Sequence, residues 1–433
     1  MNYLKNIYVL SMTVCVLLLS TAAYAITMEN ALKSSLVNNL EIKLEKNNSL
    51  VAKESVNQSI SSYFPSIILQ GSISESEVTN IKSQTGVLSS GYNLEPSSAS
   101  ITISQNIFNG FANYYSLIKS KTDLKSQNLI YENKKQEIIL ATLESYYNVI
   151  LAEKNTASFR DNFIAIEKRY NSAQAEFESG IISKTDVAFA KTRMSAAKIA
   201  LINSDIDYDN AKNTFRDITG VEAEDLKFES IKSKEIFEKE QFIESVKRGS
   251  FAIRLATLDV KSKNASTGIA RSSLLPKISL NASQTEYYDY SSTVDQFDNE
   301  TINATVTWQI FNSGNSLSKI RQAEKFKNSS YINQLLVIRD TLNLANLSHS
   351  QYIISNETVD AAKIALESAE FAYNGTVIEQ EVGERTLLDV LDARQQLLNS
   401  EIDLFKQQRN EQIIEARLLY LKGDLVVDKL FNN

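Results

Sequence analysis

The chain has 433 residues, of which 43% are hydrophobic and 22% charged, and its 45 basic and 52 acidic side chains leave a net charge of −7. One cysteine, Cys15, and one histidine, His349, are too few for a His/Cys metal site, a disulfide framework or a Ser-His-Asp nucleophile. The acidic balance does not favour nucleic-acid binding. The sequence therefore predicts a protein that is not an enzyme and that holds no cofactor or metal.

Residues 1–25 predict a secretory signal peptide. Lys5 precedes the apolar run Val9–Leu19, and Ala23-Tyr24-Ala25 is a small-x-small cleavage motif. The apolar run is shorter than the ~20 residues that a membrane helix needs, so an uncleaved membrane anchor is the less favoured alternative. We therefore expect export to the periplasm or to the outer membrane of a double-membraned bacterium.

The remainder is predicted to be two copies of one unit, residues 26–222 and 223–433. Ile107 recurs as Ile310 and Gly180 as Gly383, at one offset (310 − 107 = 383 − 180 = 203). Each copy is expected to contain a helix that ends before a proline, two strands, a long helix, a glycine turn and a returning helix. The expected ranges are about 29–62, 66–76, 98–108, 112–178 and 184–217 in the first copy, and about 240–274, 277–287, 301–311, 315–378 and 384–422 in the second.

The four expected strands each have one apolar face and one face of small polar side chains. In 301–311, for example, Ile302, Ala304 and Val306 alternate with Thr and Asn residues. Each segment has about the 9–11 residues that a tilted membrane strand needs. The pattern predicts membrane strands in contact with outer membrane lipid; soluble hairpins packed on helices are the alternative.

The long helices and the small number of strands together predict an oligomer. The range 112–178 contains neither Pro nor Gly and would form a helix roughly 100 Å long, too long for one globular core. In a bilayer every backbone polar group must be paired, and the smallest closed barrels need about eight strands. Two, three or four chains must therefore share one barrel, which the helices continue as a tube. A periplasmic coiled-coil rod without membrane strands, acting as a structural or interaction protein, is the alternative.

Beyond these patterns, the sequence resembles the outer membrane efflux protein family of TolC-like channel-tunnels over residues 26–425. The resemblance rests on the duplicated segment order and on motifs beside the strands and at the helix turns: 62–66, 106–110, 273–277, 309–314, 178–187 and 381–393. It implies a mainly α fold with a membrane β-barrel, in which a homotrimer forms a 12-strand barrel and a periplasmic α-helical tunnel. It also implies an exit duct for efflux or type I secretion that docks to an inner-membrane pump through a periplasmic adaptor protein. A periplasmic adaptor is a less favoured reading, because this chain has only 12 Gly and 3 Pro.

Gly180 and Gly383 are expected where a long helix reverses into its returning helix. A tight reversal needs a residue that tolerates positive φ, so their predicted role is structural. By resemblance, the same turns, which include Ile181, Val382 and Thr386, also dock the adaptor.

Asp389 and Asp392 are three residues apart and share one face of the second returning helix. In a three-fold tube they would form stacked carboxylate rings that attract cations. From the residues alone, a solvated helix face with Arg385 paired to Asp389 is the favoured interpretation. The resemblance implies aperture rings at both positions, and a gate latch between Arg385 and Asp186, which follows Thr185. The best-known family members carry a Tyr of this latch at the position of Gln380. This difference leaves the strength of the latch undetermined.

Trp308, near the end of the last expected strand, is a candidate for an interfacial aromatic belt, with simple packing as the alternative. His349 lies among polar residues of a long helix and is expected to be a surface or interhelix residue.

Overall fold

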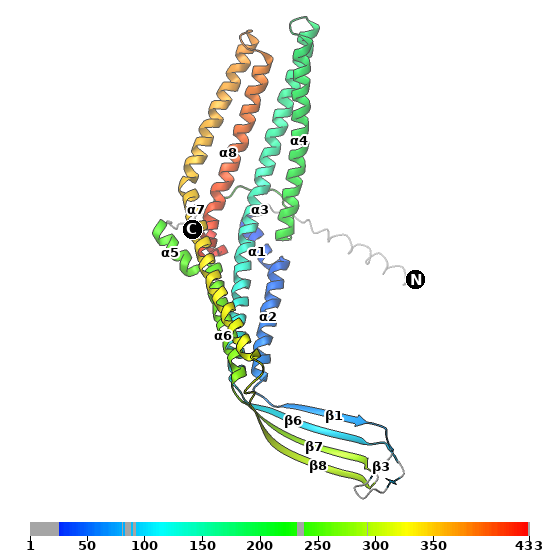
Figure 1. Cartoon of the computed structure of the whole chain (residues 1–433). Coiled ribbons are helices and arrows are strands. Elements are labelled where there is room, and N and C mark those ends of the chain that lie inside the picture. Colours follow the sequence, from blue (N-terminus) through cyan, green and yellow to red (C-terminus); the bar gives the residue numbers. More distant parts are fainter. Residues whose placement is uncertain are drawn as a thin grey trace, which may run out of the picture. The chain divides into compact units, whose positions relative to one another are not determined.

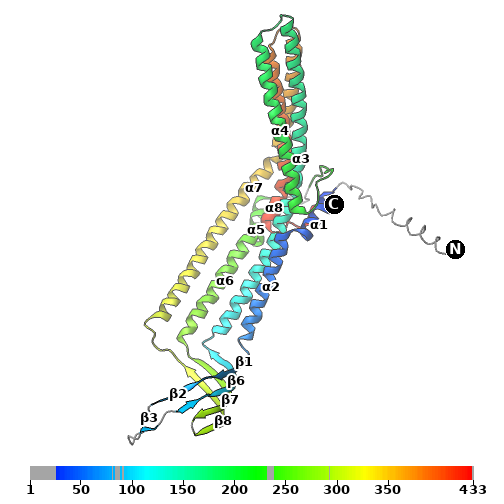
Figure 2. The same cartoon turned by 90° about the vertical axis from the view of Figure 1, so that its right-hand side faces the viewer.

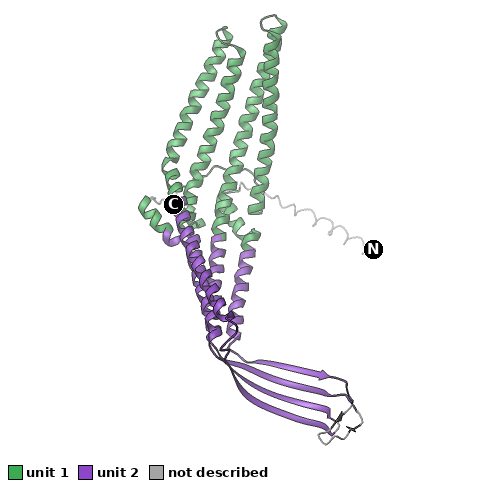
Figure 3. Ribbon diagram, viewed as in Figure 1, with its two compact units in different colours: residues 1–42, 134–246, 344–433 green, residues 43–133, 247–343 purple. Residues whose placement is uncertain are grey.

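The computed structural model describes residues 26–79, 81–82, 88–89, 92–231, 238–291 and 293–431. The predicted signal peptide, residues 1–25, lies outside the described residues. The chain divides into two compact units (Figure 3). Unit 1 comprises residues 1–42, 134–246 and 344–433, and unit 2 comprises residues 43–133 and 247–343. Two long helices, α3 (Ala112–Glu178) and α7 (Asn315–Glu381), which are labelled in Figure 1, contribute to both units.

Four strands of unit 2 form an antiparallel sheet in the order β1-β6-β7-β8. Their bounds are β1 Ser66–Ile73, β6 Ser97–Asn109, β7 Lys277–Ser291 and β8 Val294–Thr307. Between β1 and β6 the chain forms four short strands, β2 Ser76–Val78, β3 Ile81–Lys82, β4 Leu88–Ser89 and β5 Tyr92–Leu94. β2 pairs with β5 and β3 with β4, so the first hairpin continues beyond the main sheet.

The register gives the sheet one apolar and one polar face near its helical end. Ile67, Ile103, Ala282 and Ile302 form one cross-strand row, and Ile302 is 81% exposed. The adjacent row on the opposite face consists of Ser66, Ser104, Asn281 and Asn303, in which the Asn281 side chain donates to that of Asn303 at 3.2 Å. An exposed apolar face opposite small polar side chains suits a sheet that separates lipid from water.

The second hairpin is longer than the sequence analysis expects. β7 continues to Ser291 and β8 begins at Val294, because the rings of Tyr287 and Phe297 stack across the strands at 4.7 Å and support pairing of a polar segment. β8 also ends earlier than expected, at Thr307. The exposed Trp308 therefore follows the strand, and its indole nitrogen donates to the carbonyl of Leu274 at 3.1 Å.

The helices of unit 2 follow the same lateral order as the strands to which they connect. Figure 2 shows α7, α6 (Phe251–Arg271), α3 and α2 (Leu40–Ser61) side by side. Side-chain hydrogen bonds join each neighbouring pair: Ser59 to Ser120 at 2.6 Å, Ser262 to Asp123 at 2.6 Å, and Gln334 to Thr257 at 2.8 Å. A short 3₁₀ helix, Ser272–Leu274, leads from α6 toward β7. The order α2-α3-α6-α7 thus matches β1-β6-β7-β8.

Unit 1 contains α1 (Met28–Asn38), α4 (Lys184–Thr219), α8 (Leu387–Lys422), α9 (Val427–Phe431) and most of α5 (Lys239–Gly249). α3 and α7 each have 67 residues, and α4 and α8 each have 36. The two halves of the chain therefore carry helical hairpins of equal length.

Aromatic side chains form part of the core of unit 1. Tyr146 and Tyr147 on α3 are buried with Phe215 on α4, and the Tyr146 hydroxyl donates to the carbonyl of Lys227 at 2.8 Å. Burial, together with the nearby charge of Glu229, raises the pKa of Tyr146 to about 12. The phenol therefore stays protonated at physiological pH and keeps donating, which holds the segment after α4 against α3.

Several helix bounds differ from the expected ranges. The expected helix 29–62 is interrupted at Asn39, whose ψ is 128° and whose side chain accepts from the backbone of Glu41 and caps α2. The expected helix 240–274 is interrupted at Ser250, between α5 and α6. α7 passes through Gly375 and ends at Glu381 rather than at 378, and α8 begins at Leu387 rather than at 384. No helix in the described ranges is both long enough and apolar enough to cross a membrane.

Candidate functional site at the helix tips

Both helical hairpins of unit 1 reverse through a glycine in the left-handed conformation. Gly180 has φ +76° and Gly383 has φ +86°. Around Gly180 the backbone N–H of Ile181 donates to the carbonyl of Glu176 at 2.8 Å, the pattern of a Schellman motif, and Glu384 donates to Glu379 in the same way at 2.9 Å. A Cβ at either glycine would meet nothing within 4 Å. Glycine is therefore required at both turns by the backbone conformation, as the sequence predicts. It is not required by lack of space for a side chain.

Each returning helix begins with a capping box. The Asp186 carboxylate accepts from the backbone N–H of Ser183 at 3.0 Å, and the Ser183 hydroxyl accepts from the N–H of Asp186 at 3.2 Å. Asp389 and Thr386 form the equivalent pair at 2.8 and 3.2 Å. These hydrogen bonds hold the pKa of both carboxyls below the ordinary value, and the charge of Arg385 contributes further at Asp389. Both aspartates are therefore ionised and fix the start of a helix.

Asp392 is joined to the other hairpin of the same chain. Its carboxylate accepts from the Arg193 guanidinium on α4 at 2.7 Å, and both side chains are about half exposed. Arg193 is a residue that the sequence analysis missed, because a pairing between helices nearly 200 positions apart leaves no local periodic signal. The ion pair partly neutralises Asp392, whereas Asp389 has no ion pair within the described part of the chain.

Arg385 and Gln380, two of the other expected latch residues, form hydrogen bonds within the same chain. Arg385 donates to the Glu379 carboxylate at 3.0 Å across the α7–α8 turn. Gln380 accepts from Arg169 of α3 at 3.5 Å, a long hydrogen bond that links the two hairpins. Thr185 is exposed in the first turn of α4. Within one chain, the described contacts thus give Arg385 and Asp186 different partners.

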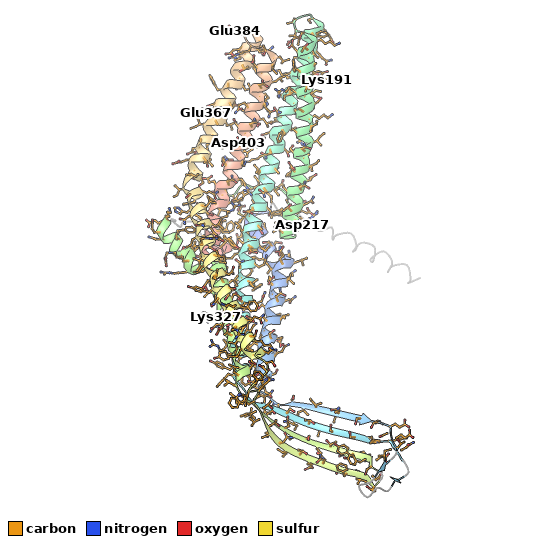
Figure 4. All side chains as sticks on the ribbon, in the orientation of Figure 1. Lys191, Asp217, Lys327, Glu367, Glu384 and Asp403 are labelled. Atoms are coloured by element: carbon orange, nitrogen blue, oxygen red, sulfur yellow. The ribbon has the colours of Figure 1, made fainter. Side chains whose placement is uncertain are left out.

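The tips expose apolar and charged side chains above a buried apolar seam. Ile181 is 72% and Val382 is 70% exposed, one at each turn. Figure 4 shows the side chain of Glu384 at the α7–α8 tip and that of Lys191 on α4. The seam beneath consists of Ile166, Ala173, Ala190, Ala197 and Leu391, from α3, α4 and α8. Small residues on α4 allow close packing, so the turns are presented on a firm support.

No group of three or more His, Cys, Asp or Glu side chains in the described ranges is arranged to hold a metal ion. The tips carry carboxylates, the guanidinium groups of Arg193 and Arg385, and exposed apolar side chains.

Comparison with known proteins identifies the family to which the chain belongs. The model of the family described as "Outer membrane efflux protein" matches residues 31–221 and 242–424. Outer membrane efflux protein BepC of Brucella suis is 25% identical over 94% of this chain and 88% of its own. Outer membrane protein TolC of Escherichia coli is 23% identical over 77% of this chain and 71% of its own.

Solved structures share the fold. The CmeC outer membrane channel of Campylobacter jejuni has a TM-score of 0.78 at 18% identity, over 92% of this chain and 86% of that one. The outer membrane protein VceC of Vibrio cholerae has a TM-score of 0.74 at 14% identity, over 92% and 96%. The predicted mainly α fold and the predicted family resemblance are confirmed. This chain belongs to the outer membrane efflux protein family and is an export channel protein of the outer membrane.

Proposed function

We propose that three copies of the chain form an exit duct whose twelve-stranded barrel crosses the outer membrane. The observation that carries the proposal is the open sheet, in which β1 and β8 are edge strands. Backbone groups on both edges need partners in a bilayer, and pairing β8 of one copy with β1 of the next would supply them. The polar face of the sheet carries small side chains. Such a face suits the water-filled lumen of a larger barrel better than the interior of an eight-stranded barrel, which side chains fill. Three copies is the number that the family resemblance implies.

The helix tips are proposed to form the gate at the periplasmic end. Asp389 and Asp392 would form the aperture rings, and Arg385 of one copy would reach Asp186 and Thr185 of its neighbour. Support comes from the ionised state of Asp389 and from the proximity of Arg385, whose charge already lowers the pKa of that carboxyl. The Gln380 to Arg169 hydrogen bond would take the place of a Tyr latch.

The exposed tip residues are proposed to dock a periplasmic adaptor protein that connects the duct to an inner-membrane pump. Ile181, Val382 and Thr386, with the turn glycines Gly180 and Gly383, present backbone and apolar surface there. Relatives include proteins named for alkaline protease secretion and for cobalt-zinc-cadmium resistance. We therefore assign the duct two candidate transport roles, efflux and type I secretion.

Conductance in planar bilayers tests the gate. Replacing Asp389 and Asp392 together by Asn retains a side-chain acceptor for the helix cap and removes the ring charges. We expect lower cation preference and weaker block by polyvalent cations, because the throat loses its negative field. Replacing Arg385 by Ala is expected to raise conductance, because the latch is removed. Unchanged selectivity, block and conductance in both variants would refute the gate.

A further inference from the structure

A basic pocket lies in unit 2 on the seam between α3 and α6, with a volume of about 610 Å³. Lys125 lines it from α3, and Arg254 and Lys261 line it from α6; all three are exposed. None of the three forms an ion pair within the described part of the chain. Lys247 and Arg248, at the end of α5, complete the rim, and Glu132 is the single carboxylate among the lining residues.

This concentration of positive charge occurs in a chain whose net charge is −7. The charges of Lys125, Arg254 and Lys261 repel one another, and a bound anion would lower that repulsion. Lys and Arg side chains of this kind form their strongest hydrogen bonds with carboxylate, sulfate or phosphate oxygens. The rim therefore selects an anionic group.

The floor of the pocket has a different chemistry. Leu129 and Ile253 line it and are only 7% and 8% exposed, and the half-buried Leu258 also lines the pocket. The hydroxyl of Thr257 already donates to the carbonyl of Ile253 and accepts from Gln334, both at 2.8 Å, so its hydrogen-bonding capacity is largely used. An apolar floor under a cationic rim fits a ligand with both characters.

We propose that this pocket binds amphipathic anions, meaning compounds with an apolar body that carries one carboxylate, sulfate or phosphate group. The apolar body would rest on Leu129 and Ile253, and Lys125, Arg254 and Lys261 would hold the anionic group. The class includes free fatty acids and anionic lipids, which share this chemistry.

The pocket remains accessible in the assembly proposed above, on which this step rests. In the order α2-α3-α6-α7, copies join through the outer members α2 and α7, whereas the pocket lies between the inner pair. A bound amphiphile therefore does not compete with the contacts between copies.

The test uses the full protein in nanodiscs and a dansyl-labelled undecanoate, whose fluorescence rises on transfer to an apolar site. The triple variant Lys125→Gln, Arg254→Gln, Lys261→Gln is expected to lose affinity by about tenfold or more, because charge-assisted hydrogen bonds are lost. The matched control Lys121→Gln, Lys263→Gln, Lys277→Gln removes the same charge from solvent-accessible positions of α3, α6 and β7, outside the pocket lining and away from α2 and α7, and is expected to bind like the parent. The uncharged methyl ester of the probe is expected to show no difference between these proteins.

Three results would overturn the proposal. They are equal affinity of the parent and the pocket variant, equal loss in both triple variants, and inorganic phosphate displacing the probe as well as unlabelled laurate does. Competition by laurate and by vesicles of phosphatidylglycerol then distinguishes a free fatty acid from a lipid source. The copy number of each sample, measured by native mass spectrometry, separates failure of this site from failure of the trimer.

Discussion

At the scale of single residues, the tip aspartates divide between helix caps and an ion pair between hairpins. Asp186 and Asp389 complete capping boxes, so they are structural in each chain regardless of assembly. Asp392 instead pairs with Arg193. Arg385 forms an ion pair with Glu379 rather than with Asp389, the partner that the sequence offered as an alternative, although the charge of Arg385 still acts on Asp389. The sequence analysis does not name these caps, although a Ser or Thr three residues before an Asp is a local signal for them. Partners on another hairpin leave no local signal.

The cap of α8 should depend on pH in a defined direction. The folded-state pKa of Asp389 lies below its ordinary value of 3.8, mainly because of the Thr386 hydrogen bonds. The stabilisation is therefore present above the unfolded pKa and is lost as pH falls through the folded pKa. Hydrogen exchange, corrected for intrinsic rates, should show protected tip amides at neutral pH and loss of that protection below about pH 3.8. Thr386→Ala should reduce protection already at neutral pH, whereas Thr358→Ala, an exposed position of α7 far from the turn, should not alter the tip. Tip protection that is independent of pH would contradict the cap assignment.

Arg193 should tune the aperture. Arg193→Gln leaves the Asp392 carboxylate without its counter-ion, so the throat becomes more negative and should bind hexamminecobalt about fivefold more tightly. The change in stability should be small, because exposed pairs contribute at most about 1 kcal/mol. Single-channel block measures the effect. Arg160→Gln is the control, since Arg160 and Asp205 form another exposed pair between α3 and α4, at 3.5 Å. Equal block in both variants would mean that Arg193 does not act on the gate.

At the scale of elements, the long helices could be predicted because residues 112–178 lack Pro and Gly, and α3 occupies that range. An isolated Gly375 does not stop α7, since one glycine costs a helix only about 1 kcal/mol. The breaks at Asn39 and Ser250 are less predictable, because neither residue is a strong breaker and tertiary context decides. The start of β8 depends on a cross-strand aromatic pair, which alternation of polar residues does not reveal.

The junctions between strand and long helix allow a matched test of packing. Gly110 and Gly314 each lie at such a junction, with φ of +66° and +80°, although the repeat aligns Gly110 with Ser313. A Cβ at Gly110 would collide with the carbonyl oxygen of Ser272, whereas at Gly314 nothing lies within 4 Å. Gly314→Ala should cost about 1 kcal/mol from backbone strain, and Gly110→Ala about 1–3 kcal/mol more. Thermal unfolding followed by circular dichroism measures the difference, and equal losses would argue against close approach at Gly110.

At the scale of the whole molecule, the sequence predicts that one chain supplies too few strands to close a barrel. The sheet of one chain has the open edges that this prediction requires. Four strands were predictable from alternation, and the shared order of strands and helices follows from the duplicated connectivity. How many copies close the barrel is set by contacts between chains, and no periodicity within one chain encodes it.

Disulfide trapping between β1 and β8 tests the proposed closure most directly, because the only native cysteine, Cys15, lies in the predicted signal peptide. Gln70→Cys on β1 is combined in turn with Cys at Asn299, Thr301, Asn303 and Thr305, which lie on the same face of β8. In one register the cysteines of neighbouring copies should come within bonding distance. Oxidation should then give a ladder on denaturing gels that ends at three chains, while Gln70→Cys alone gives no band above two chains. A ladder that ends at another number, or no ladder in any register, would contradict the shared barrel.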